Sequence, residues 1–450
     1  MVSRGAAIGA ALALGGLGGL GACDYITSSF ETNTFSGDPF PTLVQGQTGA
    51  LVVGMTVDGD DTVLHTAVLD VMSPLNVLDE GASTPVSIDD EAGYTLLGET
   101  APAGPFDIAR AHFITQNLMT LHPCSGSGNT CTVGTPDAPQ AFDAIIGMPS
   151  FGGDALQLDL AEDAASGSDT IYILPNIAGS ETRLSYACNA VFPVPFRGGG
   201  TIIVGGTELA FTNWRIAMQA CLSPDPDPAL VQSQRGTDAL FVVSTAIGTS
   251  ILAESAYERY QLDHPEAPDS DTLPAATVLL EDGPITGHQT TLPTMAFVAI
   301  STTNQRAPCR QVWASHLLAQ HDCTGSDDCP CNPATDPNDG TFCAVPADVE
   351  LAPPDGFDIL IVDDSNDTLQ SLRTELEPDE PQVDGILGTQ ALRQIQLGID
   401  YPDDRLVAKC ANPDPSVCIA RPEIAQEEDR TQVQGCLMEY GSAGLGSAID

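Results

Sequence analysis

Asp70 is the side chain that the sequence places best for acid–base chemistry. Residues 51–57 and 63–69 alternate apolar with small or polar side chains, which predicts a β-hairpin whose second strand runs into the turn Asp-Val-Met-Ser-Pro at 70–74. A carboxylate at the end of a strand can act as a general acid or base when a suitable second group lies beside it. The chemistry open to Asp70 therefore depends on the group that the fold brings next to it.

Motifs for other chemistries are incomplete. The Ser-Gly-Ser-Gly run at 125–128 lacks the Gly-x-Ser-x-Gly pattern of serine hydrolases. The glycines at 198–200 are not followed by Lys-Ser or Lys-Thr, so they do not form a phosphate loop. The acidic loops lack EF-hand spacing and the histidines lack HExxH spacing. We therefore expect neither a metal site nor a cofactor.

The second half of the chain repeats part of the first. Residues 143–160 and 384–401 align without a gap at a constant offset of 241 residues (384 − 143). Both copies read Asp, small, Ile, aliphatic, Gly, then eight residues, then Leu, any residue, aliphatic. The pattern predicts an internal duplication. A predicted strand at 237–248, entering the turn Ala-Ile-Gly-Thr-Ser at 246–250, would then be the counterpart of the strand that ends at Asp70. We expect a helix at 254–262 after this turn.

The order of these motifs resembles that of the bilobal, pepsin-like aspartic peptidases. In each lobe of that family, a strand enters an Asp-Thr-Gly-Ser/Thr turn and a later aliphatic strand ends in glycine, as at 145–147 and 386–388 here. The turn residues of this chain that match are Asp70, Ser73, Gly248, Thr249 and Ser250. The resemblance implies an all-β fold of two duplicated β-barrel-like lobes, with a disulfide-rich insertion in the C-terminal lobe.

The same resemblance implies a defective catalytic site. In the family each lobe contributes one aspartate, and the two carboxylates share a proton and hold a water. Here Ala246 stands at the predicted position of the second aspartate. An alignment shifted by two residues would place Ser244 there, which supplies no carboxylate either. We therefore expect that Asp70 is vestigial. The sequence does not decide whether the protein is an enzyme, but it favours a protein that is not one.

The charge balance excludes some partners. The chain carries 15 Lys+Arg against 61 Asp+Glu, a net charge of −46. Binding to nucleic acid or to an anionic membrane surface needs clustered cations, which are absent from this sequence. The chain is nevertheless 42% hydrophobic, enough to build a folded core. We expect a soluble, acidic body that does not bind nucleic acid.

The N-terminus resembles a bacterial lipoprotein signal. Residues 1–4 are cationic, residues 5–22 are uncharged, and Leu-Gly-Ala-Cys at 20–23 resembles a lipobox. This predicts cleavage before Cys23 and lipidation of its thiol. A plain secretory signal or an N-terminal membrane anchor is the alternative. The protein is then expected to be lipid-anchored in the cell envelope, outside the cytoplasm.

The remaining cysteines fit an oxidising compartment. Without Cys23, 12 of the 13 cysteines remain, an even number. The candidate pairs are Cys124 with Cys131 and Cys188 with Cys221. The sequence leaves open the pairing of Cys309, Cys323, Cys329, Cys331, Cys343, Cys410, Cys418 and Cys436. The cysteines at 323–343 could also bind zinc, but they lack Cys-x-x-Cys spacing, so disulfides are favoured.

These features predict the following organisation. Residues 1–23 form the signal, 24–48 a flexible spacer, 49–195 the N-terminal lobe, 196–409 the C-terminal lobe with the insertion 309–343, and 410–450 a Cys-containing tail. The predicted function is to bind a peptide or protein in the cleft between the lobes without cutting it. One alternative is an active aspartic endopeptidase in which Asp70 belongs to an atypical dyad. A second is a structural envelope protein.

Overall fold

The computed structural model describes a large part of the chain between residues 39 and 423. The described residues are 39–44, 49–57, 65–73, 76–79, 91–97, 108–112, 114–116, 143–148, 155–160, 169–174, 189–193, 198–204, 207–213, 216–223, 236–280, 283–298, 309, 347–375, 382–401, 403–412, 414 and 416–423. The predicted signal and lipidation site at Cys23 lie outside these residues.

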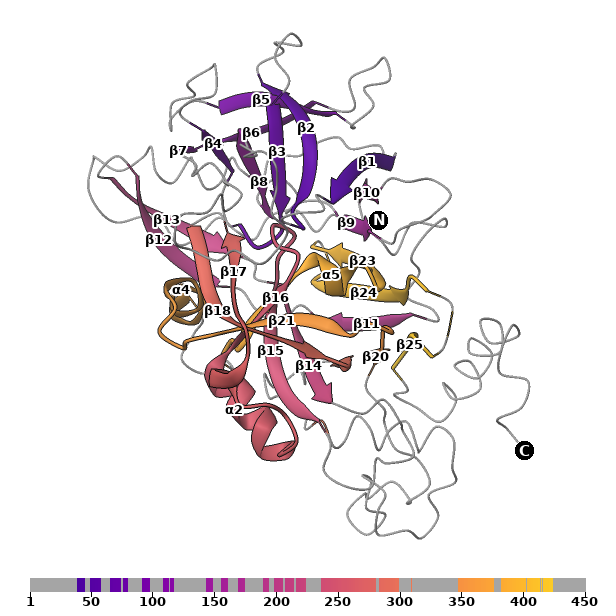
Figure 1. The fold of residues 1–450 in the computed structure, drawn as a ribbon. Helices are drawn as coiled ribbons and strands as arrows, with labels where there is room; N and C mark the ends of the chain where they lie inside the picture. The colour runs from indigo at the N-terminus through magenta and orange to yellow at the C-terminus, as the bar shows by residue number, and fades with distance from the viewer. Residues whose placement is uncertain are drawn as a thin grey trace, which may run out of the picture.

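The first lobe is built on a hairpin whose second strand leads to Asp70. As predicted, β2 (Leu51–Val57) pairs antiparallel with β3 (His65–Asp70). The strand β8 (Ala144–Gly147) then lies parallel to β3. The other strands of this lobe are β4 (Val77–Asp79), β5 (Glu91–Leu97), β6 (Ile108–His112) and β7 (Ile114–Gln116). Figure 1 shows them at the top in indigo and violet.

The second lobe contains a ten-stranded sheet. In spatial order its strands are β17 (Ala275–Leu280), β18 (Gly283–Leu292), β21 (Phe357–Val362), β16 (Ser250–Ala253), β22 (Gly385–Leu387), β15 (Thr237–Val243), β14 (Ala217–Ser223), β19 (Thr294–Val298), β20 (Asp348–Leu351) and β25 (Cys418–Arg421). The strands β12 (Gly198–Val204) and β13 (Thr207–Asn213) form a separate hairpin.

The helices whose bounds lie within the described residues are short and belong to the second lobe. They are α2 (Glu254–Asp263), the 3₁₀ turn η3 (Ser270–Thr272), α4 (Asp367–Glu375) and α5 (Thr389–Leu392). The helix predicted at 254–262 is therefore confirmed as α2, which buries Ala256, Tyr257 and Tyr260. None of the helices within the described residues is long and apolar enough to span a bilayer.

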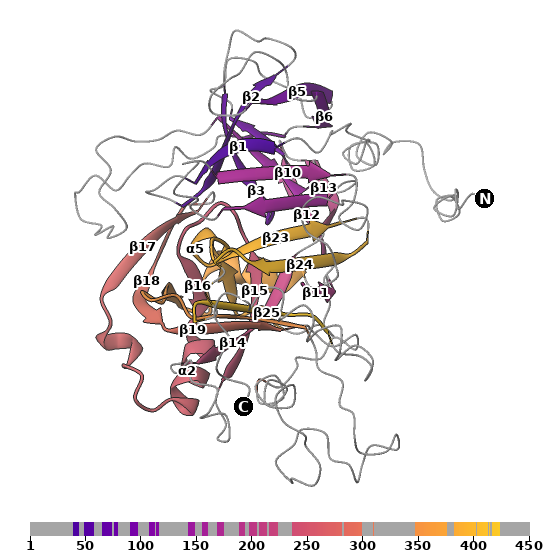
Figure 2. The same cartoon turned by 90° about the vertical axis from the view of Figure 1, so that its right-hand side faces the viewer.

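An antiparallel sheet of six strands joins the lobes. Its order is β1 (Pro39–Val44), β10 (Asp169–Leu174), β9 (Ala155–Asp159), β23 (Ile395–Asp400), β24 (Arg405–Cys410) and β11 (Ala190–Pro193). At its centre Gln157 pairs with Gly398, its own counterpart at the repeat offset of 241. A pseudo-two-fold axis therefore passes between β9 and β23, which lie side by side in Figure 2.

Matching hydrogen bonds confirm the duplication outside this sheet. In the first lobe Thr66 N donates to Asp143 Oδ2 at 2.9 Å, and Asp143 N donates to Thr66 O at 2.8 Å. In the second lobe Leu240 N donates to Asp384 Oδ2 at 2.9 Å, and Asp384 N donates to Leu240 O at 2.8 Å. The residues on β3 and β15 are thus related by an offset of 174 (240 − 66). The two crossing strands, β8 and β22, are related by an offset of 241.

The strands β8, β15 and β22, which lead to the junction of the two lobes, are buried on both faces. Every described residue of β8 and β22 is buried, and β15 has a single half-buried position, Asp238. A strand covered on both faces carries a continuous apolar run instead of an alternating one. This explains why Leu-Phe-Val-Val at 240–243 and Ala-Ile-Ile at 144–146 lack polar residues.

Three predicted segment boundaries differ from the structure. The strand β1 lies within the predicted flexible spacer 24–48, but it pairs antiparallel with both β10 and β2. The strand β11 pairs with β24 as β1 pairs with β10, so residues 190–193 of the predicted N-terminal lobe 49–195 pair with a strand of the second half of the chain. The predicted tail 410–450 contributes β25 to the second-lobe sheet.

Two disulfides lie within the described residues. Cys221 pairs with Cys309, and Cys410 pairs with Cys418. The predicted pair of Cys188 with Cys221 is therefore wrong, because residues 221 on β14 and 309 have Cα atoms 5.5 Å apart, within disulfide reach. The predicted pair Cys124–Cys131 lies outside the described residues. So do the other cysteines whose pairing the sequence leaves open, Cys323, Cys329, Cys331, Cys343 and Cys436.

Candidate functional site

Asp70 lies at the junction of the two lobes. It is the last residue of β3 and stands opposite Gly147, the last residue of the parallel strand β8. Its exposed fraction is 0%, so the carboxylate is enclosed by protein. The hairpin β2–β3 and the crossing strand β8 together fix its position.

The strand register places Ser244, not Ala246, at the position equivalent to Asp70. In the second lobe β15 runs parallel to β22, with Val243 opposite Leu387. Ser244 follows Val243 directly and so reaches the level of Gly388, the counterpart of Gly147. The prediction that Ala246 occupies the second aspartate position is therefore off by two residues, because the strand ends at Val243 and its turn begins earlier than predicted.

The structure brings Ser244 into contact with Asp70. Ser244 Oγ donates to Asp70 Oδ1 at 3.0 Å, and Thr245 N donates to the same oxygen at 3.0 Å. Within its own turn, Met72 N also donates to this oxygen at 3.0 Å. Ser244 Oγ in turn accepts from Ala246 N at 3.1 Å. Two of these three donors to Asp70 come from the opposite lobe.

Thr245 forms a second connection between the lobes. Its Oγ1 donates to Leu69 O at 2.5 Å and accepts from Val71 N at 3.2 Å. Thr245 is fully buried, as are Ser244 and Asp70. Sequence reasoning did not assign a role to Thr245, although its position directly after Ser244 matches that of Val71 directly after Asp70.

The other predicted turn residues have structural roles in both lobes. Ser73 N donates to Asp70 O at 3.0 Å, which closes the first turn. Ser250 lies outside the second turn, at the start of β16, where its Oγ accepts from Gly388 N at 3.0 Å. Its counterpart is Asn76 (250 − 76 = 174), whose Oδ1 accepts from Gly147 N at 2.8 Å.

Gly248 and Thr249 lie after the second turn and are half-buried. Gly248 faces the backbone of the first lobe closely, because a Cβ atom added to Gly49 would lie 2.1 Å from Gly248 Cα. Gly49 has a φ of +72°, which also favours glycine. These two positions therefore let the chains of the lobes approach each other beside the site.

Tyr401 indicates that the surroundings of Asp70 are dry. Burial raises the pKa of the Tyr401 phenol, and the negative charge of Asp70 adds to the rise. Tyr401 has an exposed fraction of 1% and packs in the main apolar core. The surroundings of the site are thus largely free of solvent, where electrostatic interactions are strong.

This arrangement supplies one carboxylate and one hydroxyl. Hydrolysis by a carboxylate pair needs two groups of similar acidity that share a proton and hold a water between them. A serine hydroxyl cannot take the place of the second carboxylate, because it does not ionise in the same pH range. No cluster of His, Cys, Asp and Glu that could hold a metal ion occurs among the described residues.

Comparisons with known proteins give the following results. No family model and no curated protein matches the chain. Among solved structures, the crystal structure of the aspartic proteinase from Irpex lacteus matches with a TM-score of 0.37 and 11% sequence identity. The match covers 83% of this chain and 97% of that chain.

The class of the fold follows from the topology of the chain itself. Two duplicated lobes, a shared six-stranded sheet and two turns that meet at the axis define an all-β, bilobal, pepsin-like fold. The predicted fold class is therefore confirmed. The disulfides Cys221–Cys309 and Cys410–Cys418 both tie together parts of the second half of the chain.

Proposed function

We propose that this protein is a pepsin-like protein that binds a peptide or protein segment between its lobes without hydrolysing it. The observation that carries the proposal is the contact of 3.0 Å between Ser244 Oγ and Asp70 Oδ1, at the position where a second carboxylate would be required. Loss of positioned acid–base help lowers a rate by roughly 10² to 10⁴, and the group that would hold the water is absent as well.

We further propose that the protein acts outside the cytoplasm, anchored in the cell envelope by a lipid at Cys23. The two disulfides support an oxidising compartment. The signal-like pattern at 1–23 supports export and lipidation. Labelling of the expressed protein with a radioactive fatty acid, beside a Cys23→Ser variant, tests the anchor. A label that persists in the variant would contradict it.

Incubation with a diverse peptide library between pH 3 and 7 tests the absence of hydrolysis. When the purified chain is immobilised on a column, we expect it to retain peptides from the library and to leave them intact. The Ser244→Asp variant restores a carboxylate opposite Asp70, and we expect it to cleave peptides at acidic pH. Ala246→Asp is the matched control: it adds the same charge two residues away, and we expect it to stay inactive.

The same assay separates the three functional alternatives. Cleavage by the wild type that disappears in Asp70→Asn would establish an active endopeptidase with an unusual dyad and overturn the proposal. A wild type that neither cleaves nor retains any peptide would favour a structural envelope protein. Retention without cleavage is the result expected for a binding protein.

A further inference from the structure

We propose that Asp70 is a positioning residue that fastens the two lobes together by replacing a hydroxyl group that the first lobe lacks. This inference goes beyond the proposed function, because it concerns the structural role of the aspartate, and it does not depend on any ligand. It rests on a comparison of the two turns across the pseudo-two-fold axis.

Thr245 and Val71 are counterparts across this axis. They are separated by 174 residues (245 − 71), the same offset that relates Ser244 to Asp70. One bond of the expected symmetric pair is present: Val71 N donates to Thr245 Oγ1 at 3.2 Å. Its symmetric equivalent would run from Thr245 N to an Oγ atom on residue 71. Valine carries no such atom, so this bond cannot form.

Asp70 accepts the hydrogen bond that residue 71 cannot. Thr245 N donates to Asp70 Oδ1 at 3.0 Å, across the lobe boundary. Because Thr245 has an exposed fraction of 0%, its N–H group could not donate a hydrogen bond to water instead. A buried N–H without an acceptor is strongly unfavourable. The carboxylate therefore satisfies a donor that the duplicated fold would otherwise leave unsatisfied.

Ser244 fits the same role for Asp70. Its hydroxyl donates to Asp70 Oδ1 at 3.0 Å, so it adds a second bond across the boundary. A carboxylate at position 244 would instead place a second negative charge beside the first in a buried region, or require a shared proton. The residues at these positions thus complement one another: Asp70 supplies an acceptor, Val71 lacks a hydroxyl, and Ser244 supplies a neutral donor.

A rescue experiment on the full chain tests this assignment by thermal unfolding. Asp70→Ala is expected to lower the melting temperature by roughly 3 to 10 °C, because hydrogen bonds to a buried charged acceptor are lost. Val71→Thr introduces the missing hydroxyl. In the Asp70→Ala background we expect it to regain at least half of that loss, although in the wild type it brings no comparable gain.

Asp143→Ala provides the matched control for the rescue. Asp143 also accepts a backbone N–H, from Thr66 at 2.9 Å, but this bond lies within the first lobe. We expect Val71→Thr to restore nothing in that background. Equal effects of Val71→Thr in both backgrounds would show a general stabilisation and would overturn the proposal.

Hydrogen exchange at the Thr245 amide gives a second readout. Its protection should fall at least tenfold in Asp70→Ala and recover in Asp70→Ala/Val71→Thr. If Asp70→Ala does not fold, Asp70→Leu, which keeps a similar side-chain size and offers no acceptor, enters the same comparison. Unchanged protection of Thr245 without the Asp70 carboxylate, or the absence of rescue by Val71→Thr, would show that Asp70 does not fasten the lobes.

Discussion

At the scale of single residues, the role of an aspartate in this protein follows from its neighbours. Asp70 Oδ1 accepts three hydrogen bonds at 3.0 Å, two of them from the other lobe. Asp364 is the acceptor in a different network, at the end of β21. Ser255 donates to it through N at 2.8 Å and through Oγ at 2.7 Å, and Arg373 Nη2 donates at 2.9 Å.

These contacts lower the pKa of Asp364. Burial is the largest single influence and raises the pKa, but the hydrogen bonds from Ser255 and the guanidinium of Arg373 together outweigh it. A carboxyl whose pKa is lower in the folded than in the unfolded protein stabilises the fold above its unfolded pKa. That contribution is lost as the pH falls through the folded pKa.

Replacement of Asp364 by asparagine should therefore have a pH-dependent effect. We expect Asp364→Asn to lower the free energy of unfolding by about 1 kcal/mol at neutral pH, since the carboxylate is partly exposed. The difference from the wild type should shrink as the pH falls below 3.8, the unfolded pKa, because the wild type then gains the proton too. Urea unfolding between pH 2 and 7 measures it.

The neighbouring carboxylate of Asp363 provides the control. Hydrogen bonds from Ser365 lower its pKa, but the group lies fully at the surface and its partner is two residues along the chain. Asp363→Asn should therefore change stability less than Asp364→Asn at every pH. Equal losses for the two variants would show that the contacts with Ser255 and Arg373 contribute little.

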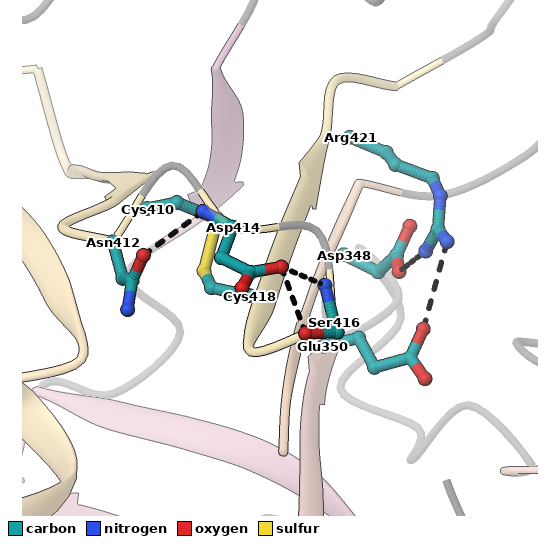
Figure 3. The surroundings of a disulfide bond; sticks show 8 residues. All are labelled: Asp348, Glu350, Cys410, Asn412, Asp414, Ser416, Cys418 and Arg421. Carbon is teal, nitrogen blue, oxygen red and sulfur yellow. Dashed lines mark hydrogen bonds and ion pairs between the residues drawn. A yellow bond between two sulfur atoms is a disulfide. The ribbon is translucent and has the colours of Figure 1, made fainter. Parts of the chain in front are cut away.

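At the scale of elements, a buried ion-pair cluster holds the strand β25 in place. Arg421 on β25 bonds Asp348 Oδ2 through Nη1 at 2.7 Å and pairs with Glu350 Oε2 through Nη2 at 3.5 Å, both on β20 (Figure 3). The side chains of Asp348 and Glu350 are only 1% and 9% exposed. The disulfide Cys410–Cys418 lies beside this cluster and ties β25 to the end of β24.

Removal of Arg421 should release β25. In Arg421→Met two carboxylates remain close together in a buried position without their cation, and we expect a loss of about 3 to 5 kcal/mol in the free energy of unfolding. Hydrogen exchange should increase first at the amides of 418–421. Arg405→Met, at an exposed position of β24, is the control and should cost less than about 1 kcal/mol. Similar losses in both variants would contradict a specific role for the cluster.

At the scale of the whole molecule, the shared sheet and the disulfides connect segments that are distant in the sequence. The Cys221–Cys309 bond closes a loop with a sequence separation of 88, whereas Cys410–Cys418 closes one of 8. In the chain-entropy description, a cross-link stabilises a fold more when it closes a longer loop, because it removes more freedom from the unfolded chain.

The two disulfides should therefore differ in their effect on stability. Replacement of both cysteines by alanine is expected to cost about 4 to 5 kcal/mol for the 221–309 pair and about 2 to 3 kcal/mol for the 410–418 pair. Guanidinium unfolding of the two double variants under oxidising conditions measures the difference. A larger loss for the shorter loop would show that native-state contacts of Cys410 and Cys418 outweigh the entropy of loop closure.

Much of the architecture could be predicted because it depends on local patterns. The hairpin at 51–69, the helix at 254–262 and the gapless repeat of 143–160 at 384–401 follow from alternation, composition and spacing. The register of the second turn could not be predicted in this way. Residues 240–247 are all buried, and such a run contains no alternation that marks where the strand ends.

By itself, the sequence determined an acidic, duplicated, all-β chain with Asp70 at the end of a strand and no aspartate to match it in the second lobe. The tertiary structure decided which residue faces Asp70, which cysteine pairs with Cys221, and how β1, β11 and β25 join their sheets. Each of these depends on contacts between segments far apart in the chain. Such contacts are selected by the packing of the whole fold, so local sequence patterns carry no record of them.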